Sequence, residues 1–141
     1  MALVNCRRNI RGAKTRLINL TNAITGKNYE IDNMLNGQVR FVAVRAKFNE
    51  ATADKERLKR ALDLLGEWQN RWETVLEEAE GDVANAENEF EQFLNAENVQ
   101  VAEDGARDQL DRLEGVIIDL SRRSASASSR ASTKFSQASK N

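Results

Sequence analysis

Apolar residues recur at steps of three and four between Leu58 and Phe93, which places them along one face of a helix. The spacing is close to the heptad repeat of a coiled coil, and Leu76 and Leu94 widen the stripe. If residues 38–95 form one helix, it is about 85 Å long at roughly 1.5 Å per residue. The globular core that 141 residues can form is too small to bury so long a stripe. The segment must therefore fold back as a hairpin or pair with a second chain.

This stripe is the predicted interaction seam. Trp68 and Trp72 lie one turn apart within it, and tryptophan is a frequent anchor at protein interfaces. Ordinary packing inside the seam explains the same pair, and the two interpretations merge if the seam joins two chains. The seam comprises Leu58, Leu62, Leu65, Trp68, Trp72, Val75, Ala79, Val83, Phe90 and Phe93.

The rest of the chain also shows helical periodicity. Proline is absent, so nothing forces a break inside a helix. Gly26 predicts the end of a first helix, and Asn28 is suited to cap a second. We expect helices over about 6–25, 29–95 and 104–123. Within the second, a stripe is expected to continue through Ile31, Leu35, Val39, Val42, Ala46 and Asn49.

The sequence therefore predicts an all-α fold in which long amphipathic helices form an antiparallel helical hairpin or coiled-coil bundle. Residues 1–123 make up this helical domain. Residues 124–141 are basic and rich in serine, a low-complexity composition that predicts a disordered tail or linker.

Charge is distributed unevenly along the chain. Residues 1–27 carry basic side chains and no acid, residues 66–119 are strongly acidic, and residues 120–141 are again basic without an acid. We expect the basic first helix to dock on the acidic segment, or to contact an anionic partner. The candidate contacts with an anion or a nucleic acid are Arg7, Arg8, Arg11, Lys14 and Arg16.

The residue inventory argues against catalysis. Histidine is absent and Cys6 is the only cysteine, which excludes the common nucleophile–base pairs and zinc ligand sets. We expect no enzymatic activity, no cofactor and no metal site. The N-terminus lacks the apolar core of a signal peptide, and no apolar run reaches the roughly 18 residues of a membrane span. The expected location is intracellular, in the cytoplasm.

The opening segment Arg8-Asn9-Ile10-Arg11-Gly12-Ala13-Lys14-Thr15-Arg16-Leu17 resembles the start of Gag-like polyproteins from Pao/BEL-type LTR retrotransposons. The order of parts over about 1–125 is also similar: a basic helix, a long acidic amphipathic stretch and a serine-rich linker. The resemblance implies a role in the assembly of retroelement particles. It supplies no defined site residues, and the chain lacks the zinc knuckle and protease signatures of longer Gag polyproteins.

We therefore expect a non-enzymatic assembly module that associates through coiled-coil helices, with itself or with a partner helix. One alternative is a module that binds RNA nonspecifically, or an anionic surface, through its basic ends. Another is a helical adaptor or chaperone that holds a partner's helix against Trp68 and Trp72.

Overall fold

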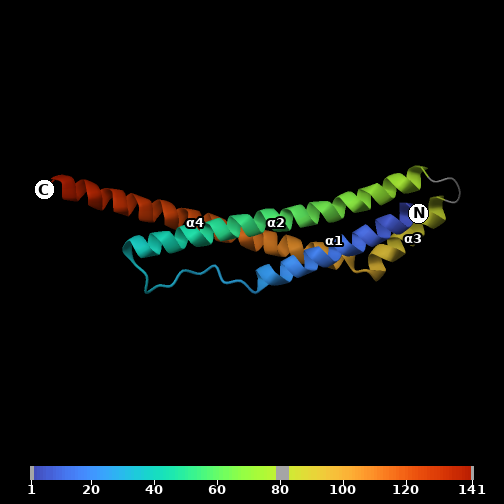
Figure 1. The fold of residues 1–141 in the computed structure, drawn as a ribbon, viewed down its shortest axis with the longest axis horizontal. Helices are drawn as coiled ribbons and strands as arrows, with labels where there is room; N and C mark the ends of the chain where they lie inside the picture. Colours follow the sequence, from blue (N-terminus) through green and yellow to red (C-terminus); the bar gives the residue numbers. More distant parts are fainter. Residues whose placement is uncertain (1, 79–82, 141) are drawn as a thin grey trace. The chain divides into compact units, whose positions relative to one another are not determined.

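The structure is a computed structural model that describes the backbone of residues 2–78 and 83–140. Side chains are described for residues 4–78 and 84–125. Within these ranges the chain forms α-helices and no strand, which confirms the predicted all-α class (Figure 1). The helices are α1 (Ala2–Thr25), α2 (Gly37–Glu78), α3 (Val83–Ala96) and α4 (Val99–Lys140). The tail predicted to be disordered, 124–141, lies almost entirely outside the described side chains.

The helices form two compact units, described separately below. Unit 1 consists of Met1–Gly26 and Arg57–Leu110, and unit 2 consists of Lys27–Glu56 and Asp111–Asn141. Helices α2 and α4 both continue across the boundary, so each contributes one part to each unit.

Unit 1 is a bundle in which α1 runs antiparallel to α2, and α3 and the start of α4 complete the packing (Figure 1). Each of these elements contributes apolar side chains to the core, because each carries one apolar stripe. The buried residues are Cys6, Ile10, Ala13, Leu17 and Ile24 of α1, Leu58, Ala61, Leu65, Trp72 and Leu76 of α2, Phe90 of α3, and Val99, Ala102 and Ala106 of α4.

Unit 2 combines the first part of α2, a segment of α4 and the linker before α2. Its apolar cluster brings together Ile31 of the linker, Val44 of α2 and Leu120 of α4. Phe48 and Val116 pack against this cluster and remain partly exposed. The linker therefore occupies a position that a third helix would fill in a three-helix bundle.

The predicted helix over 29–95 is wrong at its start, because the linker forms turns instead. The side-chain oxygen of Asn28 accepts a hydrogen bond from the Glu30 N–H at 2.8 Å, and that of Asp32 accepts one from the Met34 N–H at 2.9 Å. Side-chain oxygens that bond to the N–H two residues ahead stabilise turns in competition with helix. Asparagine and aspartate, which also favour helix caps, thus hold the linker in a non-helical conformation.

The long helix also divides between Glu78 and Val83, where residues 79–82 lie outside the described residues. The rings of Trp72 in α2 and Phe90 in α3 lie 4.4 Å apart between centroids. The chain therefore folds back as a hairpin, one of the two solutions that the length of the seam allowed.

The connection between α3 and α4 is much shorter than the expected one, since α4 begins at Val99 and not near residue 104. Asn98 adopts a φ of 54°, in the left-handed region that asparagine tolerates better than most residues. Its N–H donates to the carbonyl of Asn95 at 3.2 Å. Because the turn is so compact, α4 begins at the residue directly after Asn98.

We predict that Leu65→Ala lowers the free energy of unfolding by about 2–5 kcal/mol, because the Leu65 side chain is fully buried in unit 1. Chemical denaturation followed by circular dichroism measures the change. The control is Val101→Ala on α4 of the same unit, where the side chain is 69% exposed and the change should stay within about 0.5 kcal/mol. Equal losses in both variants would contradict the assignment of the core.

Candidate association surface

The predicted interaction seam lies in the core of unit 1. Trp72 is 1% exposed, and its ring also lies 5.1 Å from that of Phe93. Leu58, Leu65 and Phe90 are buried as well, whereas Leu62, Trp68, Val75 and Phe93 are half-buried. Ala79 and the side chain of Val83 lie outside the described residues. The chain's own helices cover this surface, and its use as an interface between chains stays a prediction.

Two of the basic residues of α1 bind an acid within unit 1. The Arg11 Nε donates to a Glu97 carboxylate oxygen at 3.0 Å, and the Lys14 Nζ donates to the other oxygen at 2.8 Å and to the Glu97 carbonyl at 2.9 Å. These hydrogen bonds from Lys14 and Arg11 lower the pKa of Glu97. Among the described side chains of the acidic segment, Glu97 is thus the carboxylate that the basic helix binds.

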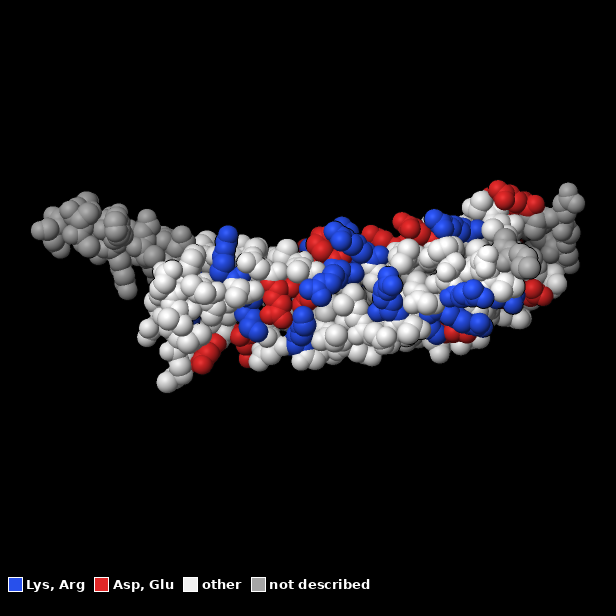
Figure 2. Space-filling view, viewed as in Figure 1, with Lys and Arg blue, Asp and Glu red and all other residues white. Residues whose placement is uncertain are grey.

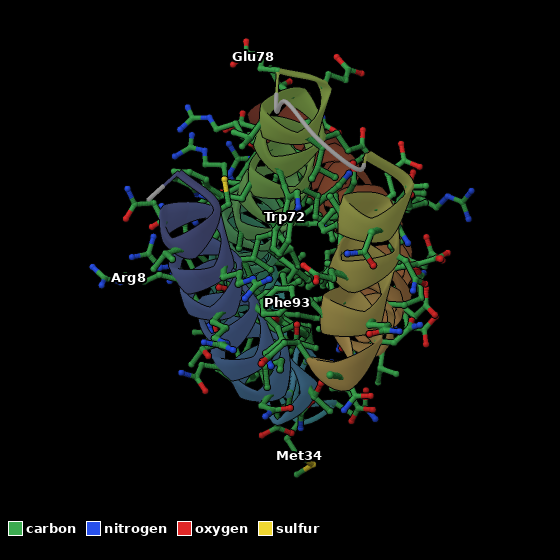
Figure 3. All side chains as sticks on the ribbon, turned by 90° about the vertical axis from the view of Figure 1, so that its right-hand side faces the viewer. Arg8, Met34, Trp72, Glu78 and Phe93 are labelled. Atoms are coloured by element: carbon green, nitrogen blue, oxygen red, sulfur yellow. The ribbon has the colours of Figure 1, made fainter. Side chains whose placement is uncertain are left out.

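The remaining basic residues of α1 have different surroundings. The Arg7 guanidinium lies 5.4 Å from the Trp72 ring centroid and 5.8 Å from that of Phe93, in cation–π geometry. Figure 3 shows both rings between the helices and Arg8 on the outside of α1. Arg16 is also exposed. Side chains of both signs occur along the face shown in Figure 2.

A buried carboxylate that the sequence analysis did not single out anchors the linker in unit 2. Asp54 of α2 is 1% exposed. It accepts a hydrogen bond from the Tyr29 hydroxyl at 2.7 Å, and bonds from the Lys27 Nζ at 2.9 and 3.1 Å. The Lys27 ammonium also lies 3.4 Å from a Glu50 oxygen. The linker is therefore held to α2 by a partly buried ion pair and a buried hydroxyl.

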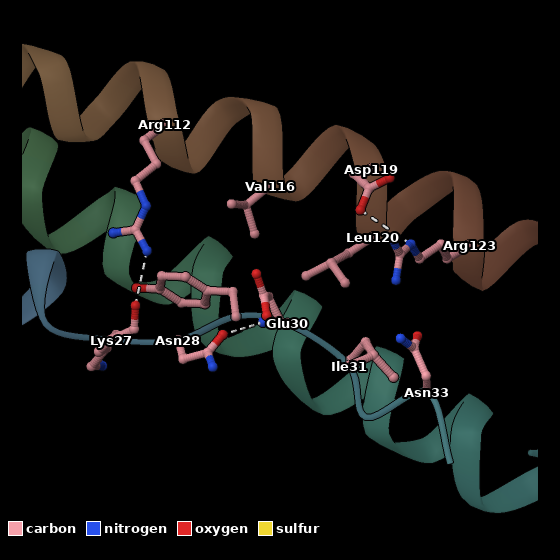
Figure 4. A pocket seen from close by; sticks show the side chains of 11 residues that line it. Lys27, Asn28, Glu30, Ile31, Asn33, Arg112, Val116, Asp119, Leu120 and Arg123 are labelled. Carbon is pink, nitrogen blue, oxygen red and sulfur yellow. Dashed lines mark hydrogen bonds and ion pairs between the residues drawn. The ribbon is translucent and has the colours of Figure 1, made fainter. Parts of the chain in front are cut away.

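Helix α4 fastens the same linker from its other side. The Arg112 guanidinium donates to the Lys27 carbonyl at 2.8 Å and lies 5.4 Å from the Tyr29 ring centroid. Between the linker and α4 lies an open pocket of about 590 Å³, with Val116 and Leu120 on its α4 side (Figure 4). Among the charged side chains that line it, Asp119 and Arg123 form an ion pair at 3.1 Å. Among the described residues, no group of three or more cysteine or acidic side chains is placed to hold a metal ion.

An apolar stripe on α2 of unit 2 faces away from the unit's own core. Val39 is 63% exposed and Val42 is 55% exposed, and three further residues on the same face are also exposed. We call this face the α2 stripe, and it comprises Val39, Val42, Ala46, Asn49 and Ala53. The expected stripe through Val39, Val42, Ala46 and Asn49 is therefore present on α2 but lies outside the core. Ile31 and Leu35, which were expected to begin it, belong to the non-helical linker.

The rotation of α2 about its axis explains this exposure. Val44, Ala51 and Asp54 lie at helical spacing and are buried, because the linker and α4 pack against their side of the helix. Residues 31–36 are not helical, so the apolar pattern of the linker does not set the phase of the helix that follows. Asp54 was the available signal, since this acid stands at core spacing between Ala51 and Leu58.

Comparison of the chain with protein-family models, with curated proteins and with solved structures finds no match. No helix in the described part of the chain is both long and apolar enough to cross a bilayer.

Tyr29 and Lys27, the two linker residues that bind Asp54, have shifted pKa values. Burial and the hydrogen bond to Asp54 raise the pKa of Tyr29 above its usual range, and the hydrogen bond to Asp54 raises the pKa of Lys27. A raised pKa in the folded state stabilises the fold below the ordinary pKa. This stabilisation is lost as the pH rises toward the folded value.

We predict that the free energy of unfolding falls as the pH rises above about 10, the ordinary pKa of tyrosine, and that it falls less steeply in Tyr29→Phe. Urea denaturation at a series of alkaline pH values measures both slopes. Near neutral pH, Tyr29→Phe should cost about 1–3 kcal/mol, because Asp54 loses a buried donor. Identical slopes in both proteins would show that Tyr29 is not the titrating group.

Proposed function

We propose that the protein is a non-enzymatic helical assembly module, and that it associates with copies of itself through the α2 stripe. The observation that carries the proposal is the exposure of this stripe in unit 2. Its residues follow one another at steps of 3, 4, 3 and 4, the spacing of a coiled-coil seam.

The hydrophobic effect supplies a reason for pairing. A second helix laid along the α2 stripe would remove Val39 and Val42 from water, and burial of apolar surface stabilises a complex by about 25 cal/mol per Å². The stripe spans only about two heptads, and alanine contributes little surface. We therefore expect association at micromolar to hundred-micromolar concentrations.

The resemblance of the opening segment to Gag-like polyproteins supports the same class of function, since Gag-like chains assemble into particles. The alternative of nucleic-acid binding has less support from the contacts of α1. Arg11 and Lys14 already bind Glu97, which leaves the exposed Arg8 and Arg16 as the candidates with no ion pair among the described residues.

We predict that the sedimentation coefficient of the protein rises with concentration between about 1 and several hundred micromolar. The double variant Val39→Glu/Val42→Glu should remain monomeric, because it places charges in the seam. Analytical ultracentrifugation makes the measurement. The control is Val101→Glu, which places the same charged side chain at an exposed position of unit 1. A compact monomer throughout the range in the unmodified protein would refute self-association.

A further inference from the structure

The α2 stripe can be examined position by position, because its spacing assigns each residue a place in a heptad. Val39, Ala46 and Ala53 take the first place, and Val42 and Asn49 take the fourth. The opposite side of the same helix carries the buried residues Val44 and Ala51. One face of α2 therefore serves the unit's own core while the other remains free for a partner.

Two charged side chains border the stripe on opposite sides. Arg45 precedes the first-place residue Ala46 and is exposed, and Glu50 follows the fourth-place residue Asn49 and keeps 39% of its side chain exposed. Glu50 lies 3.4 Å from the Lys27 ammonium and 3.8 Å from that of Lys47, which are loose ion pairs at a partly solvated position. Its carboxylate can therefore accept a further cation.

The five-residue separation of Arg45 and Glu50 discriminates between pairing directions. In a parallel, in-register pair of helices, the residue before a first-place position lies beside the partner's residue five positions later. Arg45 of each copy would then face Glu50 of the other, so the dimer would contain two attractive ion pairs. In an antiparallel pair each border meets the like border of the partner, so Arg45 cannot face Glu50. In the register that places Val42 beside Ala46, Arg45 would approach Arg45 of the other copy instead.

The position of Asn49 also favours parallel pairing of the two helices. In a parallel, in-register pair the two Asn49 side chains meet, and each amide can donate to the other. In an antiparallel pair, fourth-place residues face first-place residues, so the Asn49 amide would lie against valine or alanine. Burying an amide without a partner costs roughly 1–3 kcal/mol, and a single polar residue in a seam is known to fix register.

The α2 stripe ends after Ala53, because charged residues follow it. The next positions in the same spacing are Glu56 and Arg60, and both are exposed. Charged residues in a seam oppose burial, so the apolar contact is confined to residues 39–53.

We propose that two copies of the chain pair through α2 as a parallel, in-register coil over residues 39–53, with Arg45 of each copy beside Glu50 of the other. This inference rests on the proposed function, since it assigns the geometry of that same self-association. The partner at the α2 stripe is thus a second copy of this chain.

Disulfide trapping tests the direction of pairing. In a Cys6→Ala background, which removes the natural cysteine, we would prepare Val42→Cys and Ala46→Cys separately and oxidise each at concentrations where dimers sediment. Each variant alone should form a covalent dimer, because in-register pairing places each seam residue beside its own copy. Val101→Cys, which is exposed in unit 1, is the control and should stay monomeric.

The outcomes separate this inference from the proposed function. Cross-linking only in a mixture of the two cysteine variants would establish antiparallel pairing and overturn the inference while self-association stands. Dimers that sediment but do not cross-link in any combination would place the interface elsewhere, which overturns both this inference and the role of the α2 stripe in the proposed function. Failure to sediment as a dimer at any concentration would remove the proposed function itself.

Charge reversal tests the contact between Arg45 and Glu50. We predict that Arg45→Glu weakens dimerisation by about tenfold, since two attractive pairs become two repulsive ones. Arg45→Glu/Glu50→Arg should regain most of the affinity, and urea denaturation would verify that it is folded. Lys59→Glu is the matched control, because it reverses an exposed charge of α2 outside the stripe. If Arg45→Glu and Lys59→Glu weaken dimerisation equally, Arg45 does not face a carboxylate.

Discussion

The burial of the Asp54 carboxylate governs the structure of unit 2. A charged group removed from water must be paired and hydrogen-bonded, and the linker supplies both partners through Lys27 and Tyr29. Meeting this requirement brings the linker alongside α2, where Ile31 can join Val44 in the apolar cluster. It also fixes which side of α2 faces inward. The exposure of the α2 stripe on the other side is a consequence of where this carboxylate lies.

The structure of unit 1 depends on a different constraint, which is that a long apolar seam must be buried. The chain turns back after α2, so that α3 lays Phe90 and Phe93 against Trp72. Arg11 and Lys14 of α1 add polar contacts at the edge of this core, with Glu97 as their common acceptor. Because the seam is covered within the chain, the proposed contact between chains uses the α2 stripe, which is a weaker surface. A module held together weakly at each contact is suited to reversible assembly.

Much of the fold could be predicted from the sequence, because helical periodicity and the absence of proline act locally. The end of α1 before Gly26 and the burial of Leu58, Leu65 and Trp72 follow from such patterns. The course of the linker could not be predicted, since asparagine and aspartate favour turns and helix caps alike, and the choice depends on distant Asp54. The candidate surface was missed for the same reason: periodicity identifies a stripe on α2, but tertiary contacts decide which stripe is buried.

The placement of the aromatic residues offers a practical consequence. Both tryptophans, Trp68 and Trp72, belong to unit 1, and Tyr29, the single tyrosine of the chain, belongs to unit 2. Tryptophan emission therefore reports on one unit, while tyrosine absorption reports on the other. Without any added label, the natural chromophores can reveal whether the two units melt together or in separate steps, although they share the continuous helices α2 and α4.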